Sequence, residues 1–367
     1  MLLSAALIVR DEAEQLSGCL ASIESLVDEM VVVDTGSVDD TREVARRFGA
    51  RLDEFPWNDN FSEARNHGLD LVRGEWVLYI DADERVLPCD ITSVREQLAD
   101  PAYVGYEVLL HPRPHFTPYW ILRLFRSDPA IRFQGAIHEN IWPAVQAYRG
   151  GKLRVGRSTL LLDHAGYEGD LARKHRRDLP LLREELRTDP TRIYCWCHMA
   201  DIHADLGEQD LAIRALETAL DVVRKRRVLT TDSSLPYVGL IHYGLDAGRD
   251  VSDLIAEGRD RFPANAQLIW LEGRALMSSG RYELAIPLFL RLTELGEDRA
   301  FDHSSAYDSR IFGVFAYDSL ATCYFRLRRY NESRQYYELA AAAAPESLEY
   351  RAKQQLSASL ARAGQTE

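Results

Sequence analysis

The sequence lacks the features of a secreted, membrane-spanning or nucleic-acid-binding protein. Its 5 cysteines in 367 residues are too few and too scattered for a disulfide framework, so we expect reduced thiols and a cytoplasmic location. No run approaches the roughly 18 uncharged apolar residues of a membrane helix, and the apolar start meets Arg10 without a signal-peptide pattern. Lys and Arg number 44 against 57 Asp and Glu, and the resulting net charge of −13 opposes nonspecific binding to nucleic acid.

What the sequence does contain is two halves with different patterns, and its 46% of hydrophobic residues is enough for a buried core. In the first half, short apolar runs at 2–9, 30–34 and 76–80 alternate with helical patterns at 14–25 and 41–48. This alternation predicts an α/β domain with a mostly parallel sheet. Ligands bind beyond the carboxyl ends of such strands, where the sequence places Asp34, Asp81 and Asp83.

In the second half, small residues recur at fixed intervals in a sequence rich in helix formers. Intervals of 12 and 7 separate the members of two sets: Ala200, Ala212 and Ala219, then Ala321, Ser333 and Ala340. Closely crossing antiparallel helices need small side chains, so the pattern predicts tetratricopeptide-like repeats. Further copies are expected at 265–298 and, with Val251 at the small position, at 232–263. We expect the helix at 348–362 to cap the stack. An unrelated helical bundle is the alternative.

The strongest local signal for chemistry is the stretch Trp76-Val-Leu-Tyr-Ile-Asp81-Ala-Asp83. A buried strand here delivers two carboxylates into a cleft, and such oxygen ligands suit Mg²⁺ or Mn²⁺ together with a diphosphate. A metal in this position neutralises the charge that develops on a diphosphate leaving group. The alternative is a pair of solvated turn residues. The turn after Asp34 adds a second polar strand end, although helix capping alone explains its Ser37 and Thr41.

Several stretches, in the same order, resemble family 2 glycosyltransferases, whose members have the GT-A fold. The stretches are Ala6-Leu-Ile-Val-Arg-Asp-Glu12 with Cys19-Leu-Ala-Ser-Ile23, Val33-Asp-Thr-Gly-Ser37, Ala64-Arg-Asn-His-Gly68, and Gly74-Glu-Trp-Val-Leu-Tyr-Ile-Asp-Ala-Asp-Glu84. A transferase domain followed by tetratricopeptide repeats resembles the bacterial subgroup that includes the peptide S-glycosyltransferases acting on sublancin-type bacteriocins.

The resemblance implies a Rossmann-like GT-A domain at 1–170, a linker helix at 171–192 and a repeat domain at 193–367. It implies an inverting, metal-dependent hexosyltransferase that uses a nucleotide sugar, linked to UDP, and a protein or peptide acceptor. One alternative is an inactive scaffold that only binds nucleotide or partner proteins. Another is a transferase for a glycan or small-molecule acceptor, with the repeats serving as a homodimer interface.

For the nucleotide, the resemblance implies contacts from the strand ends and from the loop of residues 9–12. Asp34 would hold the nucleoside beside Arg10 and Glu12, although family members usually begin this loop with Pro and Asn. Arg65 would approach the diphosphate, because a cationic fork suits phosphate oxygens. Asp81 would contact the ribose or the donor sugar.

For the metal, the resemblance implies Asp83 as a ligand, and many GT-A enzymes have a late histidine that completes the site. His164 directly follows the last apolar run of the first half and is the candidate, with an ordinary hydrogen-bonded histidine as the alternative. The basic cluster at 173–177 is either a solvated helix face or, through Lys174 or Arg177, a partner of the diphosphate.

The catalytic base and the sugar pocket are the remaining expectations. An inverting transfer needs a base that takes the acceptor's proton. Glu139 is the first candidate, because a polar triplet interrupts an apolar stretch there, and His138 is the second; helix capping is the alternative for both. Trp57 and Asn60 are expected to line the donor pocket, since aromatic faces and fixed amides hold sugar rings, whereas core packing is the alternative.

Overall fold

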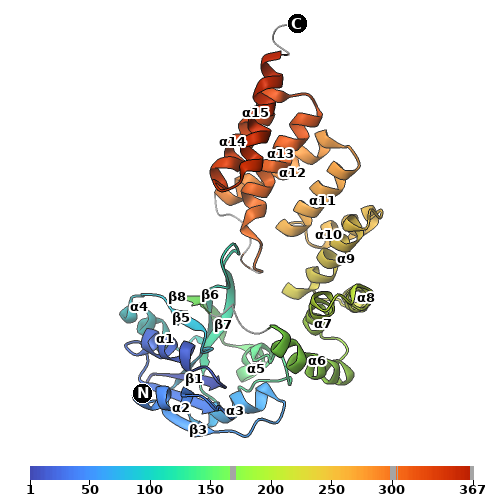
Figure 1. Cartoon of the computed structure of the whole chain (residues 1–367). Coiled ribbons are helices and arrows are strands. Elements are labelled where there is room, and N and C mark those ends of the chain that lie inside the picture. Colours follow the sequence, from blue (N-terminus) through green and yellow to red (C-terminus); the bar gives the residue numbers. More distant parts are fainter. Residues whose placement is uncertain (166–170, 298–302, 304, 364–367) are drawn as a thin grey trace. The chain divides into compact units, whose positions relative to one another are not determined.

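The computed structural model describes residues 1–165, 171–297, 303 and 305–363, and the chain divides into two compact units (Figure 1). The first unit contains Met1–Pro114 and Pro118–Pro190, and the second contains His115–Thr117 and the chain from Thr191 onward. Within the described ranges, no helix combines the length and the apolar character needed to cross a bilayer. The expected boundary at residue 170 lies outside the described residues, and the expected linker helix groups with the first unit.

An eight-stranded sheet forms the centre of the first unit, in the order β3-β2-β1-β4-β7-β6-β8-β5. The strands are β1 (Leu3–Val9), β2 (Glu29–Asp34), β3 (Arg51–Glu54), β4 (Trp76–Tyr79), β5 (Glu84–Val86), β6 (Tyr103–His111), β7 (Tyr119–Arg126) and β8 (Arg154–His164). The first four strands pair in parallel, and β6 is parallel to β8. The strands β7 and β5 run antiparallel to their neighbours. The expected α/β class is therefore confirmed, with antiparallel strands added in the second half of the sheet.

Helices cover both faces of this sheet (Figure 1). One face carries α1 (Ala13–Ile23), α2 (Thr41–Arg47) and α4 (Ile91–Ala99), and the other carries α3 (Phe61–Leu71) and α5 (Trp142–Ala147), followed by the short helix η1 (Tyr148–Gly151). The strand β1 sends Leu7 to the first core and Ala6 to the second, as the two-residue period of a strand requires. Because both faces are covered, polar groups reach solvent at the strand ends. The helix α6 (Leu171–Thr188) completes the unit.

The second unit consists of antiparallel helix pairs (Figure 1). The pairs are α7 (Ile193–Asp205) with α8 (Gln209–Lys225), α9 (Leu235–Asp246) with α10 (Ser252–Arg261), α11 (Ala266–Ser278) with α12 (Tyr282–Glu297), and α13 (Val314–Arg326) with α14 (Tyr330–Ala343). The single helix α15 (Leu348–Ala363) packs on α14, and short helices η2 (Thr231–Ser234) and η3 (Ser309–Phe312) lie in connections. The expected all-α repeat architecture is confirmed.

Small residues let the paired helices approach, as the intervals in the sequence predicted. Ala212 and Ala340, which are members of the two sets, are fully buried. The degenerate copy keeps the same packing in a different way: a Cβ atom added to Gly244 would lie 2.3 Å from Cγ1 of Val251. The larger side chain at position 251 is thus accommodated because its partner helix has a glycine opposite it.

Candidate functional site

The turn after β4 holds Asp81 and Asp83 in place through backbone hydrogen bonds. Asp81 donates its N–H to Oε2 of Glu84 at 3.0 Å, and Glu84 donates its N–H to the Asp81 carbonyl at 3.0 Å. The Ala165 N–H donates to the Asp83 carbonyl at 2.7 Å, which ties the turn to the end of β8. Because β5 pairs Glu84 with His164, Nε2 of His164 lies 3.4 Å from Oδ2 of Asp83. The structure therefore brings the two expected metal ligands together.

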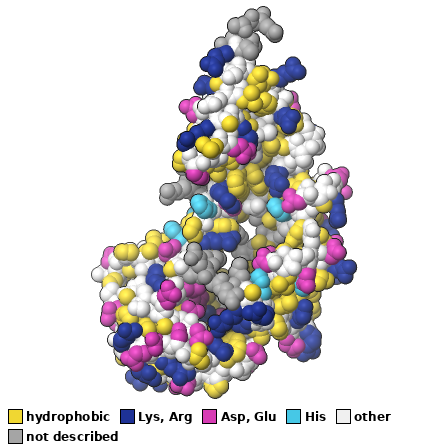
Figure 2. Space-filling view, in the orientation of Figure 1, with side chains coloured by type: hydrophobic (Ala, Val, Ile, Leu, Met, Phe, Trp, Pro, Cys, Tyr) yellow, Lys and Arg dark blue, Asp and Glu magenta, His cyan; other side chains and the backbone are white. Residues whose placement is uncertain are grey.

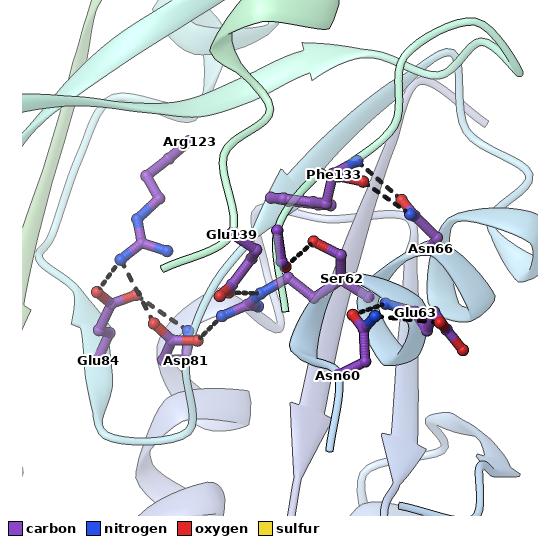
Figure 3. Close-up of polar contacts among 11 residues, drawn as sticks. Asn60, Ser62, Glu63, Asn66, Asp81, Glu84, Arg123, Phe133 and Glu139 are labelled. Atoms are coloured by element: carbon purple, nitrogen blue, oxygen red, sulfur yellow. Dashed lines mark hydrogen bonds and ion pairs between the residues drawn. The ribbon is translucent and has the colours of Figure 1, made fainter. Parts of the chain in front are cut away.

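Arg65, on α3, joins the carboxylate of Asp81 to that of Glu139 (Figure 3). Its Nη2 donates to Oδ1 of Asp81 at 2.7 Å, and its Nε donates to Glu139. The side chains of Arg65 and Glu139 are only 10% and 13% exposed. Burial alone would raise the pKa of Asp81, but the positive charges of Arg65 and Arg123 outweigh it and hold that pKa well below its usual range. Three of the expected site residues thus form one ionic group, in which Arg65 and Glu139 are largely buried and Asp81 is partly exposed.

The loop that carries Glu139 has a defined shape. Its ends, at residues 134 and 140, exchange backbone hydrogen bonds of 3.1 and 2.8 Å. Asn66 of α3 accepts from the Phe133 N–H at 2.9 Å and donates to the Phe133 carbonyl at 3.0 Å (Figure 3). His138 has a φ of 51°, a left-handed conformation that few side chains adopt, and such strain is typical of functional sites. These constraints place Glu139 against the guanidinium of Arg65.

Asp34 organises the turn after β2. Its side chain is fully buried and accepts hydrogen bonds from the N–H groups of Gly36 and Ser37, both at 3.0 Å. Arg42 lies 2.8 Å from the same carboxylate. Burial raises the pKa of Asp34, but the hydrogen bonds from Ser37 and Arg42 lower it by more. The net pKa is therefore below its usual value. The structure thus gives Asp34 a role in the turn, and its contact with a nucleoside remains a prediction.

The loop after β1 is tied to this same turn. Asp11, with a left-handed φ of 55°, donates its N–H to the Ser37 hydroxyl at 2.9 Å, and Glu12 donates its N–H to the Thr41 hydroxyl at 2.8 Å. These hydroxyls therefore link the first loop to the second, a role that the capping alternative did not include. Arg173 of α6 lies 3.1 Å from Asp11, and Arg10 is exposed in this loop.

Carboxylates at the strand ends repel one another. Burial and the charges of Asp83, Asp39 and Asp81 raise the pKa of Glu12 to about 7. Burial and Asp81 also raise the pKa of Asp83, although His164 opposes them. Such uncompensated negative charge favours a bound cation.

Among the residues that the structure describes, no cluster of three or more His, Cys, Asp and Glu side chains forms a complete metal site. The Asp83–His164 pair nevertheless fits Mn²⁺ or Mg²⁺, because these ions commonly keep water and substrate phosphates as further ligands.

The remaining expected residues lie at the start of α3 or on α6. Asn60 caps α3 with its side chain, and Trp57 packs its ring edge against Phe61 at 4.8 Å between centroids. The guanidinium of Arg177 lies 5.2 Å from the centre of the same Phe61 ring, and Lys174 is exposed. The structure does not join these four side chains to the ionic group around Arg65, and their contacts with a donor remain predictions.

Arg123 is a site residue that the sequence reasoning missed. It lies on β7, is 5% exposed, forms an ion pair with Glu84, and lies 3.5 Å from Oδ2 of Asp81 (Figure 3). The available signal was a single charged residue at the centre of the apolar run 121–125. A charge in a buried strand needs a partner, and that need points to a polar group nearby.

Comparison with known proteins supports the two-part organisation. The family model of Glycosyl transferase family 2 matches residues 4–154, and that of the tetratricopeptide repeat matches 193–222 and 316–347. A TPR repeat-containing protein of Synechococcus elongatus is 35% identical over 226 residues, which cover 59% of this chain and 56% of that protein. Glycosyltransferase SunS of Bacillus phage SPbeta is 25% identical over 199 residues, which cover 50% of this chain and 45% of SunS. The chain thus spans about half the length of these curated relatives.

Among solved structures, glucosyl-3-phosphoglycerate synthase from Mycobacterium tuberculosis aligns with a TM-score of 0.38 and 18% identity, over 51% of this chain and 79% of that one. The match at residues 4–154 falls in the first unit except for residues 115–117, and the repeat matches fall in the second. The chain therefore carries a domain of glycosyl transferase family 2 followed by tetratricopeptide repeats.

Proposed function

We propose that this protein is an inverting, metal-dependent glycosyltransferase that moves a sugar from a uridine-linked nucleotide sugar to a protein or peptide. The observation that carries this proposal is the ionic group in which the largely buried Arg65 joins Asp81 to Glu139. Asp81 of this group follows the carboxyl end of β4. The turn of residues 81–84 connects Asp81 to Asp83, which pairs with His164. One site at the strand ends thus contains groups for binding a donor phosphate and a cation, together with a carboxylate for the role of base.

The donor is assigned to the space bounded by the loop of residues 10–12 and the turns after β2 and β4. Arg65 offers a fixed guanidinium to diphosphate oxygens, and Asp81 offers a carboxylate to sugar hydroxyls. Asp83 and His164 would hold the cation. When bound, the cation supplies charge neutralisation for the departing diphosphate. The negative charge of Asp83 contributes to the raised pKa of Glu12, and this repulsion between carboxylates favours cation binding.

Glu139 is assigned the role of base. In an inverting transfer the acceptor nucleophile attacks the anomeric carbon while the bond from that carbon to the diphosphate oxygen breaks on the opposite side. The nucleophile's proton passes to the carboxylate of Glu139, and the diphosphate leaves with the bonding electron pair. The low exposure of this carboxylate and its loop geometry restrict its orientation, which favours transfer from a well-placed acceptor. His138 remains the second candidate for this role.

Binding of the acceptor is assigned to the repeat unit. This unit contains a cavity of about 670 Å³ lined mostly by side chains of α11 and α13, with others from α9, α12 and the segment of η3. Trp270, Met277 and Phe315 give it an apolar part, and Arg274 and Asp318 give it charges of both signs. Figure 2 shows hydrophobic side chains interspersed with Lys, Arg, Asp and Glu over the repeat helices. An apolar pocket with a few polar groups suits a peptide segment that carries a large side chain. We further propose the cytoplasm as its location, because all five cysteines are free thiols.

The test is a screen of nucleotide sugars for transfer and for release of the nucleoside diphosphate, with Mn²⁺, Mg²⁺ or a chelator. Turnover with a UDP-sugar that stops with chelator is expected, and turnover that resists the chelator contradicts the metal role. Glu139→Gln is expected to lower kcat by about 10²–10⁴-fold. Glu107→Gln is the control, because Glu107 lies on β6 and forms a 3.7 Å ion pair with Arg157. Absence of transfer and hydrolysis with every donor favours the inactive-scaffold alternative.

A further inference from the structure

The pairing of β4 and β7 places Arg123 beside Tyr79. The two strands are antiparallel, with Leu78 opposite Leu124, so the next pair along them is Tyr79 and Arg123. The guanidinium carbon of Arg123 lies 4.3 Å from the centre of the Tyr79 ring, and its side chain is 6% exposed. The ring thus gives the long arginine side chain a fixed path toward the end of β4.

From this path Arg123 holds Glu84, which in turn holds the turn that contains Asp81. Arg123 Nη2 donates to Oε1 of Glu84, whose side chain is 1% exposed. The other oxygen of Glu84 accepts the Asp81 N–H at 3.0 Å, and Arg123 also reaches Oδ2 of Asp81 at 3.5 Å. Both the backbone and the side chain of Asp81 are therefore connected to Arg123.

Arg123 differs from Arg65 in what it faces. Figure 3 shows Arg123 and Glu84 on one side of Asp81 and Glu139 on the other. Arg65 contacts the assigned base, whereas Arg123 forms ion pairs with Asp81 and Glu84 of the turn itself. Among the described residues, the buried Nε of Arg123 has no hydrogen-bond partner, which costs free energy. A well-packed apolar pair often replaces a buried ion pair without loss of stability. What an apolar pair would not supply is the directional contact to Glu84 and Asp81.

We propose that Arg123 is a positioning residue: through Glu84 it fixes the turn of residues 81–84, and thereby sets Asp81 and Asp83 for the donor and the cation. This inference rests on the proposed function, because it takes Asp81 and Asp83 as binding groups. Arg123 does not contact the substrate in this role. It stabilises the conformation of the turn, and its loss allows the carboxylates of Asp81 and Asp83 to move apart.

Two measurements on Arg123→Met test the proposal in the full-length chain. Hydrogen–deuterium exchange of the peptide spanning residues 81–84 is expected to be at least tenfold faster, because Glu84 no longer has a fixed orientation. Binding of Mn²⁺ in the presence of UDP, followed by the electron paramagnetic resonance signal of free Mn²⁺, is expected to weaken at least tenfold. In kinetics, the apparent KM for donor and Mn²⁺ is expected to rise more than kcat falls. Arg123→Lys keeps a charge for Glu84 and is expected to recover part of each effect.

Two further variants keep the test decisive. If Arg123→Met does not fold, Arg123→Met/Glu84→Gln removes the stranded charge and is measured in its place. Arg126→Met is the matched control on the same strand, because Arg126 lies over the Trp76 ring at 4.5 Å and donates to the Tyr103 carbonyl at 3.0 Å. This control is expected to leave Mn²⁺ affinity and exchange at residues 81–84 unchanged.

The outcomes separate this inference from the proposed function. Wild-type exchange at residues 81–84 in the folded Arg123 variant, or wild-type Mn²⁺ affinity and KM, overturns the positioning role. If the wild-type protein binds no Mn²⁺ with UDP, the metal-dependent function is overturned instead. In that case, faster exchange in the variant still shows that Arg123 holds the turn, and unchanged exchange overturns that role as well.

Discussion

Replacement of Arg65 by methionine removes the cation that joins Asp81 to Glu139. Arg65→Met retains an unbranched side chain and fills much of the same volume, so the main change is in charge. Glu139 then becomes a carboxylate that is 13% exposed and has lost the guanidinium. Asp81 is less affected, because its side chain is 36% exposed and Arg123 remains 3.5 Å from it. The cost of the substitution therefore comes mainly from Glu139.

The magnitude follows from these exposures. Removing one partner of a buried ion pair costs about 3–5 kcal/mol, because the other charge stays buried. The guanidinium of Arg65 also lies 5.2 Å from the Tyr79 ring centre, a contact that contributes about 0.5–1 kcal/mol. We therefore expect Arg65→Met to lower the free energy of unfolding by about 4 kcal/mol. For a unit of this size, that corresponds to a fall in Tm of about 8–16 °C.

Urea unfolding of the wild type, Arg65→Met, Glu139→Gln and the double variant gives the assay as a double-mutant cycle. The double variant lacks the stranded carboxylate and is expected to recover about half of the loss, or about 2 kcal/mol. Arg132→Met is the control, because Arg132 pairs at 2.7 Å with Asp70, whose side chain is 64% exposed, and such a pair contributes about 0.2–1 kcal/mol. An Arg65→Met variant within about 1 kcal/mol of the wild type, or no recovery in the double variant, would refute the reasoning.

Three other predictions concern the cation, the pH dependence and the repeats. Asp83→Asn is expected to abolish metal-dependent transfer while Tm stays the same or rises, since it removes a carboxylate whose pKa is raised by burial; full activity across a Mn²⁺ titration contradicts the metal role. The pKa of Glu12 in the folded state is about 7, above its ordinary 4.5, so folding favours the protonated form. Stability is therefore lost as the pH rises from 4.5 to about 7. Glu12→Gln should reduce that loss in urea midpoints measured across the window, and an unchanged pH profile would count against the shift. Gly273→Ala should destabilise the repeat unit by about 1–3 kcal/mol, even though Ala favours helices, because the new Cβ would lie 2.6 Å from Phe289. A higher Tm for this variant would show that Phe289 moves freely.

Local patterns in the sequence predicted part of the first unit and the helical repeats of the second. The apolar runs expected at 2–9, 30–34 and 76–80 correspond to β1, β2 and β4 within a residue at each end. The intervals of 12 and 7 between small residues located the repeats, because the crossing of two helices in one pair depends on side chains close in the chain. The carboxylates of Asp81 and Asp83 were also visible, because they directly follow a buried strand.

The tertiary structure decided which of these groups meet. His164 lies beside Asp83 only because β5 pairs with β8, and Arg65 reaches Glu139 across 74 residues of sequence. Arg123 comes from an antiparallel strand whose place next to β4 follows from sheet order, which no local periodicity encodes. Helical and strand periods report the burial of one face of an element, whereas the partners of a buried charge depend on strand register and on loops. The sequence therefore supplied the carboxylates, Arg65 and the repeats, and long-range packing decided that Arg65 and Arg123 hold the carboxylates in place.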